Sequence, residues 1–257
     1  MSEVILETRD LSRDFGAFRA VDNVSINIRR GSITGLIGPN GAGKSTLFNL
    51  LTGTLPATTG EVYLNGHDVT GFSPDRLFAK GLGRSFQIPR PFARMSVLEN
   101  VMVSPLHQKG ERFFGPFLSP GTVKAQEKSI RERALEVIDF VTLSHLANHP
   151  AGKISGGQMK LLELARVLMG DPELILLDEP AAGVNPALTS ILIDKIEQLN
   201  RQGKTFIIVE HDMDFIMSHC DPIIALAEGK IVFEGTSAEA QANPVLLDAY
   251  LGAMADA

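Results

Sequence analysis

One eight-residue segment limits the fold of this chain more than any other feature. It fits G-x-x-x-x-G-K-[ST], in which backbone N–H groups wrap phosphates, the Lys side chain reaches them and the hydroxyl ligates Mg²⁺. The apolar residues 33–37 precede it, and Leu47, Leu50 and Leu51 follow at helical spacing, so it joins a predicted strand to the anion-favouring N-terminus of a predicted helix. This context favours a phosphate site over a turn that only connects two elements. The segment comprises Gly38, Pro39, Asn40, Gly41, Ala42, Gly43, Lys44 and Ser45, and the adjacent Thr46 belongs to the same predicted site.

Continuous apolar runs predict the sheet that carries this segment. Residues 33–37, 174–177, 206–209 and 223–226 are apolar, as expected for parallel strands that are covered on both faces. Apolar residues at helical spacing lie between the runs. Because strand alternates with helix, we predict an α/β fold with a mainly parallel central sheet.

A second β element is expected near the N-terminus. Val24, Ile26 and Ile28 alternate with polar neighbours, which is the pattern of a half-buried strand. Together with residues 4–6 and 61–65 they predict an antiparallel β subdomain.

One long segment interrupts the alternation of strand and helix. Residues 97–103 and 130–141 have helical spacing with no strand between them. Between these helices, residues 104–121 are rich in Gly, Pro and Phe, which predicts an irregular surface loop whose aromatic residues form either a docking patch or a local packing cluster. The predicted single domain, residues 1–257, therefore has a core of residues 1–87 and 161–257 and an inserted helical subdomain of residues 88–160.

Composition excludes several classes of protein. With 257 residues, 44% of them apolar, the chain can bury a full α/β core. Its net charge of -6 argues against non-specific attraction to nucleic acid or anionic lipid. A single cysteine, Cys220, cannot form an internal disulfide, and the acidic first residues lack the pattern of a secretory signal. The apolar runs are far shorter than the roughly 20 residues that cross a bilayer. We therefore expect a cytoplasmic location.

Two carboxylates end the second apolar run. Asp178 and Glu179 directly follow residues 174–177, which places both at the carboxyl edge of the predicted sheet, beside the phosphate loop. His211 occupies the corresponding position after residues 206–209. The buried run before the pair favours a site over a solvated turn.

A second turn suited to phosphate lies far along the chain from the first. Ser155, Gly156, Gly157 and Gln158 precede an apolar stripe at helical spacing, so their amides lie at a predicted helix N-terminus. An ordinary helix start, with Ser155 as N-cap, is the alternative. Capping accounts for the serine but, on the sequence alone, not for two glycines followed by glutamine.

The order of these motifs resembles that of the ATP-binding subunit of ABC transporters, and the resemblance covers nearly the whole chain. It implies the ABC type of P-loop NTPase fold, with ATP and Mg²⁺ as ligands. It also implies that Ser155 to Gln158 serve the nucleotide of a partner subunit, so that two ATP molecules lie between two subunits in a head-to-tail dimer.

The resemblance assigns a role to each motif. Asp178 and Ser45 correspond to Mg²⁺ ligands, and Lys44 to the lysine that reaches the phosphates. Glu179 corresponds to the base that polarises the attacking water, and His211 to the histidine that contacts the γ-phosphate.

Two further residues take roles from position within the family pattern. Gln87 corresponds to a glutamine that reaches Mg²⁺ and water while its loop moves with a membrane partner. Phe15 corresponds to the aromatic residue that stacks on adenine, an interaction worth roughly 1–3 kcal/mol per base in nucleic-acid complexes. Phe18 is the alternative, and a packing role for Phe15 stays open.

Local sequence around the motifs resembles the branch that serves branched-chain amino-acid uptake. Residues 181–186, Ala-Ala-Gly-Val-Asn-Pro, and residues 86–92 carry this likeness, although Asn185 stands where many family members have Asp. The branch implies a peripheral ATPase on the cytoplasmic face of the inner membrane. Its implied partners are itself or a paralogous ATPase subunit, two integral-membrane permeases and, indirectly, a solute-binding protein, with no role for nucleic acid.

Other functions remain open on the sequence. Related importers of amides, urea or other small solutes, and the ATPase of a lipopolysaccharide-type exporter, share this layout. A soluble ABC ATPase acting on ribosomes or DNA usually has two nucleotide domains or a coiled-coil insertion, and the chain has neither. A P-loop kinase offers no reason for Ser155 to Gln158.

Overall fold

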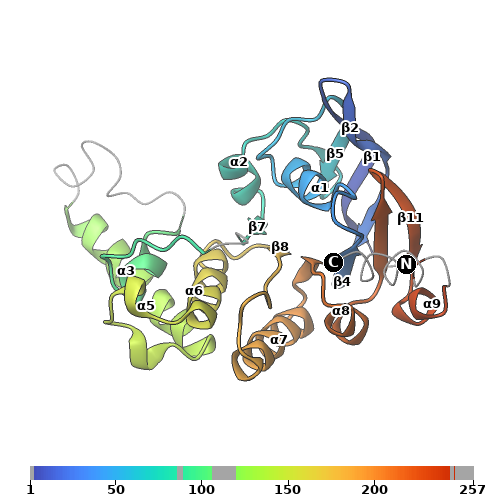
Figure 1. Ribbon diagram of the computed structural model, residues 1–257. Helices are drawn as coiled ribbons and strands as arrows, with labels where there is room; N and C mark the ends of the chain where they lie inside the picture. The colour runs from blue at the N-terminus through green and yellow to red at the C-terminus, as the bar shows by residue number, and fades with distance from the viewer. Residues whose placement is uncertain (1–2, 86–88, 106–119, 244–245, 247–257) are drawn as a thin grey trace. The chain divides into compact units, whose positions relative to one another are not determined.

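The computed structural model describes residues 3–85, 89–105, 120–243 and 246 (Figure 1). It contains two compact units, which are described separately. The first comprises residues 1–84, 173–182 and 198–257, and the second comprises residues 85–172 and 183–197. The division predicted from the sequence, with boundaries at residues 87 and 160, stays a prediction.

A six-stranded sheet forms the centre of the first unit. Its strand order is β11-β10-β4-β9-β8-β7, and all neighbours are parallel except β10 and β11. The predicted α/β class with a mainly parallel sheet is confirmed. The strands are β4 (Ile33–Ile37), β7 (Leu82–Arg84), β8 (Leu174–Asp178), β9 (Thr205–Val209), β10 (Ile223–Ala227) and β11 (Lys230–Gly235).

Continuous apolar sequence explains the strands β8 and β9. Every residue of β8 and β9 is buried, as a parallel strand with both faces covered requires. All four apolar runs form strands as predicted. The three-residue β7, which contains Gly83, and the antiparallel β11 were not predicted.

The second sheet of the first unit is antiparallel and lies near the N-terminus, as predicted. Its strand order is β2-β1-β5-β6, with β3 paired to β1. The prediction of one strand through Val24, Ile26 and Ile28 is wrong, because β2 ends at Val24 and β3 begins at Asn27, although all three apolar side chains are buried. The strands are β1 (Val4–Phe15), β2 (Phe18–Val24), β3 (Asn27–Arg29), β5 (Thr59–Leu64) and β6 (His67–Asp68).

Short helices complete the first unit. The helix α1 begins directly after the phosphate loop, and its Leu47, Leu50 and Leu51 are buried in the core together with Phe48. The helices are α1 (Lys44–Leu51), α2 (Pro74–Phe78), α8 (Met213–His219) and α9 (Ser237–Gln241).

The second unit is helical. Its helices α3, α5 and α6 pack against one another (Figure 1). The predicted loop ends too late, because Pro120 and Gly121 already belong to α5; its residues 106–119 lie outside the described part of the chain. The helices are α3 (Val97–Met102), α5 (Pro120–Phe140), α6 (Gly156–Leu168) and the 3₁₀ turns η2 (Ser144–Leu146) and η3 (Ala151–Lys153), while α7 (Pro186–Arg201) begins in this unit and ends in the first.

Among the described residues, no helix is both long and apolar enough to cross a bilayer.

Candidate functional site

The loops after three neighbouring strands bring the predicted catalytic groups together. In the sheet, β9 lies between β4 and β8, and all three run parallel. The phosphate loop follows β4, Glu179 follows β8, and His211 lies two residues after the end of β9. Parallel strands expose their carboxyl ends at one edge, which explains how residues far apart in the sequence meet there.

These loops enclose a cavity of about 370 Å³. Its lining comprises residues 40–46 of the phosphate loop and α1 together with Phe18, Ala20, Glu179, Val209 and His211. The cavity therefore gathers Lys44, Ser45, Thr46, Glu179 and His211 from the sites predicted on sequence.

Two glycines of the phosphate loop are required by its backbone. Gly38 and Gly43 have φ of 153° and 99°, and a Cβ on either would collide with a carbonyl oxygen, of Leu226 and Ala20 respectively. Gly41 also has a positive φ, of 81°, but a Cβ there would meet nothing within 4 Å. The first two glycines let the loop pass close to its neighbours, whereas Gly41 leaves space beside the loop.

Lys44 is buried at the start of α1. Its side chain is 6% exposed, and Nζ donates to the carbonyl oxygens of Gly38 at 2.6 Å and Pro39 at 3.0 Å. Burial lowers the pKa of Lys44, while the charges of Glu179 and Asp178 oppose that shift. The cation is thus held against its own loop, inside the cavity.

The turn after β8 has a strained start. Glu179 has φ of 46°, which is uncommon for a residue with a side chain. Its N–H donates to the Val209 carbonyl at 2.8 Å, and its Oε1 lies 2.8 Å from Nε2 of His211. Asp178, the last residue of β8, is 8% exposed. Glu179 and His211 therefore form a carboxylate–imidazole pair in the cavity.

Phe15 and Phe18, the two candidates for stacking on adenine, have different surroundings. Phe18 lines the cavity, whereas Phe15 stacks beneath the guanidinium of Arg13, which is centred 4.8 Å from its ring. Both phenylalanines are exposed, and Phe15 pairs with Phe18 across β1 and β2. The assignment of Phe15 to adenine stays a prediction. The sequence already offered Phe18 as the alternative, since it lies three residues after Phe15 in the same hairpin.

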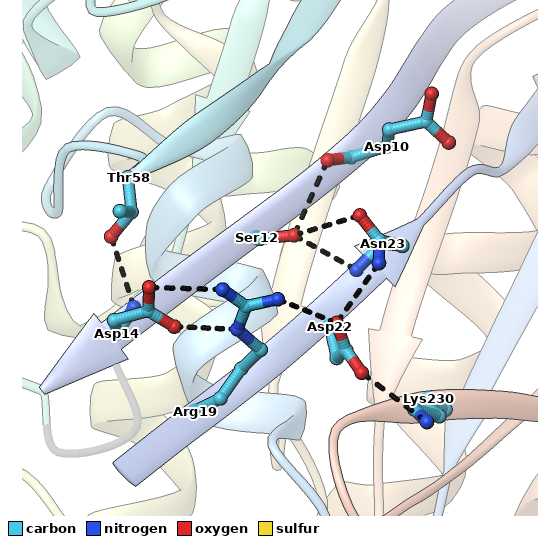
Figure 2. A network of polar contacts seen from close by, with 8 residues as sticks. All are labelled: Asp10, Ser12, Asp14, Arg19, Asp22, Asn23, Thr58 and Lys230. Carbon is cyan, nitrogen blue, oxygen red and sulfur yellow. Dashed lines mark hydrogen bonds and ion pairs between the residues drawn. The ribbon is translucent and has the colours of Figure 1, made fainter. Parts of the chain in front are cut away.

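Ion pairs stiffen this hairpin (Figure 2). Arg19 donates to both carboxylate oxygens of Asp14, at 2.7 and 3.2 Å, and to Asp22 at 3.0 Å. Lys230 reaches the other oxygen of Asp22 at 3.2 Å. Arg19 and Lys230 hold the pKa of Asp22 below its usual value. The network fixes the strands that carry Phe15 and Phe18.

In the second unit, the turn from Ser155 to Gln158 forms a capping box at the start of α6. Ser155 Oγ accepts from the Gln158 N–H at 3.3 Å, and Gln158 Oε1 accepts from the Ser155 N–H at 2.9 Å. Capping therefore explains the glutamine, contrary to the sequence argument. The signal S-x-x-Q was present in the sequence.

The two glycines of this turn have different surroundings. A Cβ on Gly157 would lie 2.6 Å from Leu188 Cδ1 and 2.9 Å from Val184 Cγ1, so a side chain there would require Leu188 and Val184 to shift. A Cβ on Gly156 would meet nothing within 4 Å. The described part of the chain gives no packing reason for Gly156.

In the first unit, the predicted site residues Phe15, Gly38, Pro39 and Asp178 are not in the cavity lining. Gln87 lies outside the described residues. Asp178 is adjacent to the lining residue Glu179 but is itself buried at the strand end. Among the described residues, no three His, Cys, Asp or Glu side chains cluster as ligands of a metal.

Comparison with known proteins decides the family. The family model described as ABC transporter matches residues 21–182. The probable branched-chain amino acid transport ATP-binding protein LivG of Archaeoglobus fulgidus is 40% identical over 97% of this chain and 96% of its own. This chain belongs to the ABC transporter family. It is an ATPase of the ATP-binding cassette type.

Solved structures agree with this assignment. The ADP conformation of the ATP-binding cassette MJ1267 matches the ABC ATPase with a TM-score of 0.83 and 38% identity, over 98% of this chain and 100% of that one. The dimeric post-hydrolysis state of the cassette MJ0796, bound to ADP and Pi, matches with a TM-score of 0.74 and 26% identity, over 91% of this chain and 99% of that one. Both matches agree that this chain has the fold of an ATP-binding cassette.

Proposed function

We propose that this ABC ATPase is the energy-converting subunit of an importer for branched-chain amino acids. The observation that carries the proposal is the cavity in which Lys44, Glu179 and His211 converge from three strand ends. The relative from Archaeoglobus fulgidus, which is named for branched-chain amino acid transport, supports the choice of solute.

The residues present fit a nucleotide with Mg²⁺. Ser45 and Asp178 offer the hydroxyl and carboxylate oxygens that this cation prefers, and Mg²⁺ is commonly held by one or two such groups together with substrate phosphates rather than by a cage of protein ligands. Gln87 is a further proposed ligand. Bound there, the cation would neutralise charge on the β- and γ-phosphates.

Lys44 binds the phosphates by exchanging partners. Its ammonium now satisfies the carbonyls of Gly38 and Pro39, and a phosphate oxygen entering the cavity offers a charged acceptor instead. The backbone N–H groups of residues 40, 41 and 43–46, at the N-terminus of α1, supply further donors, because the N-cap Gly43 makes no side-chain capping bond. Phe15 or Phe18 stacks on the base.

Glu179 and His211 act on the attacking water. The Glu179 carboxylate accepts a hydrogen bond from water and takes its proton as the oxygen attacks the γ-phosphorus, while the bond to the ADP oxygen breaks. His211 contacts the γ-phosphate and, 2.8 Å from Glu179, fixes the direction of that carboxylate. The products are ADP and inorganic phosphate.

The second turn completes the site of a partner subunit. Within the capping box, the N–H groups of Ser155 and Gln158 are already satisfied, so the amides of Gly156 and Gly157 are the ones left to bind an anion. Open space beside Gly156 allows a γ-phosphate to approach the backbone. The dimeric cassette MJ0796 supports a dimer, which we propose is head-to-tail, with itself or a paralogue.

The remaining assignments follow from the transporter role. Residues 1–87 and 161–257 act as the nucleotide-binding core, and residues 88–160 act as the helical subdomain that carries the second turn. Two permeases in the inner membrane are the partners on its cytoplasmic face, and a solute-binding protein acts through them. Importers of amides, urea or other small solutes remain the alternative within this class, while the names of the relatives do not favour an exporter.

The catalytic assignment is tested by Glu179→Gln. We expect this variant to bind ATP with unchanged affinity and to lose hydrolysis by at least about 10²-fold, the contribution of a general base. Phosphate release and equilibrium nucleotide binding measure the two properties. Unchanged hydrolysis would refute the role of Glu179.

A further inference from the structure

A buried carboxylate lies beside the two residues that act on the water. Glu210 follows β9 directly, is 4% exposed, and separates Val209 from His211. Its Oε1 accepts a hydrogen bond from the Ala181 N–H at 2.7 Å, and its Oε2 accepts one from the His211 N–H at 3.2 Å. One side chain therefore ties the turn that begins at Glu179 to the backbone of His211.

Three consecutive residues at the end of β9, Val209 to His211, hold this turn, each through a different group. The Val209 carbonyl accepts from the Glu179 N–H, the Glu210 carboxylate accepts from the Ala181 N–H, and the His211 ring contacts the Glu179 carboxylate. The turn includes the strained backbone of Glu179, and strain of this kind persists only where the surroundings hold it.

Glu210 supports the site without lining it. Glu179, Val209 and His211 line the nucleotide cavity, and Glu210 is not among the lining residues. Burial raises the pKa of Glu210; the two amides it binds and His211 oppose that shift, and the charge of Glu179 adds to it. A carboxylate is costly to bury, and here both of its oxygens accept N–H groups of the catalytic turn and of His211.

We propose that Glu210 is a positioning residue for ATP hydrolysis, which holds Glu179 and His211 at the separation where both act on the same water. The proposal rests on the proposed function, in which Glu179 polarises that water. A carboxylate can accept both N–H groups, whereas a glutamine of the same shape accepts with one oxygen and turns its own N–H groups toward the other donor. Glu210→Gln therefore breaks one of the two ties with no change in volume.

The test compares Glu210→Gln with Glu179→Gln and Thr205→Val in the full-length chain. Thr205 lies at the other end of β9, is fully buried, and accepts from the Gly31 N–H at 2.9 Å, so its variant removes a similar bond far from the chemistry. We expect Glu210→Gln to lower kcat roughly tenfold or more while its Kd for a non-hydrolysable ATP analogue stays within about twofold, because misplacement affects the transition state. Thr205→Val should lower the melting temperature and leave kcat within about twofold.

The outcomes separate the two proposals. Glu210→Gln with wild-type kcat, beside an inactive Glu179→Gln, overturns the role of Glu210 alone. Equal losses of kcat and of nucleotide affinity in Glu210→Gln also overturn it, since they indicate a general structural defect. A Glu179→Gln variant that still hydrolyses ATP contradicts the proposed function, and with it the positioning role.

Discussion

The phosphate loop and the turn at residues 155–158 both place glycines at the start of a helix, but they differ in which of their backbone amides their own chain satisfies. At α1 the N-cap Gly43 makes no side-chain bond, so the first amides have no cap. At α6 the side chains of Ser155 and Gln158 bind the amides of each other's residues. The first turn is built to surround a ligand with its backbone amides, whereas the second offers only the two amides of its glycines.

The glycines of the two turns also differ in backbone conformation and in their neighbours. Gly38 and Gly43 combine positive φ with close backbone neighbours, so the loop cannot fold without them. Neither glycine of the second turn is in the left-handed region, and packing on Leu188 accounts for Gly157 alone. The open space beside Gly156 is the observation that supports its proposed contact with a partner's phosphate.

The largest effect is expected from Lys44→Ala, which tests whether nucleotide binding by the isolated subunit depends on the phosphate loop. Lys44→Ala removes the ammonium from the cavity and should lower hydrolysis on the order of 10²-fold or more, as loss of a preorganised charged group does. Nucleotide affinity of the isolated subunit should also fall, as titration with a fluorescent ATP analogue would measure. Retained affinity in Lys44→Ala would break the distinction, because binding would then not depend on the first turn.

The next effect separates Gly156 from Gly157. Gly157→Ala forces a methyl against Leu188 and Val184, and overpacking of this kind costs about 1–3 kcal/mol in the free energy of unfolding. Gly156→Ala has space for the methyl and should unfold like the wild type, yet it should lose ATP-driven dimerisation. Denaturant unfolding and light scattering measure these properties. A destabilised Gly156→Ala, or one that dimerises normally, would contradict the assignment.

A smaller effect concerns the cap of α6. Ser155→Ala loses one side-chain acceptor and should cost about 1 kcal/mol of stability. Ser96→Ala is its matched control, because Ser96 and Glu99 form the same capping box at α3 in the same unit. Both variants should lose similar stability by thermal unfolding, while only Ser155→Ala should reduce hydrolysis, because only the cap of α6 holds the amides of Gly156 and Gly157 in place. Equal hydrolysis in the two variants would mean that Ser155 is only a cap.

The smallest effect depends on pH and distinguishes the buried Glu210 carboxyl, which follows β9, from the uncharged cap of α6. Because the folded pKa of Glu210 is raised by burial, its contribution to stability is full below its ordinary pKa and is lost as pH rises through the raised value. The stability of Glu210→Gln relative to the wild type should therefore increase over that window. Denaturant unfolding across a pH series from about 4 to about 8 measures it. Ser155→Ala should show a constant difference instead, and a constant difference for Glu210→Gln would contradict the shift.

The sequence predicts the elements whose own residues determine them, and it misses elements that form only through contacts with distant residues. The strands β8 and β9 were predictable, because both of their faces are buried and each strand therefore contains a continuous apolar run. The strand β7 was not, since three residues containing a glycine form a strand only by pairing with β8. The start of α5 was read as loop because Pro120 and Gly121 are typical of turns, although proline is tolerated in the first turn of a helix.

The residues of the candidate site also divide into those with a local sequence motif and those without one. Lys44, Ser45 and Glu179 were identified from local motifs and from the strands before them. Glu210 was missed, because its bond to Ala181 exists only once the folded sheet brings the ends of β8 and β9 together. An acidic residue between a buried strand and a predicted catalytic histidine was the only local signal.

The central claim is that each chain holds half of two ATP sites. The most direct measurement is the mass and the bound nucleotide of Glu179→Gln with ATP, alone and combined with Ser155→Arg. We predict that Glu179→Gln forms a dimer with two ATP molecules, and that the double variant stays a monomer with one ATP. A double variant that still dimerises around ATP, or a monomer that no longer binds it, would contradict the account.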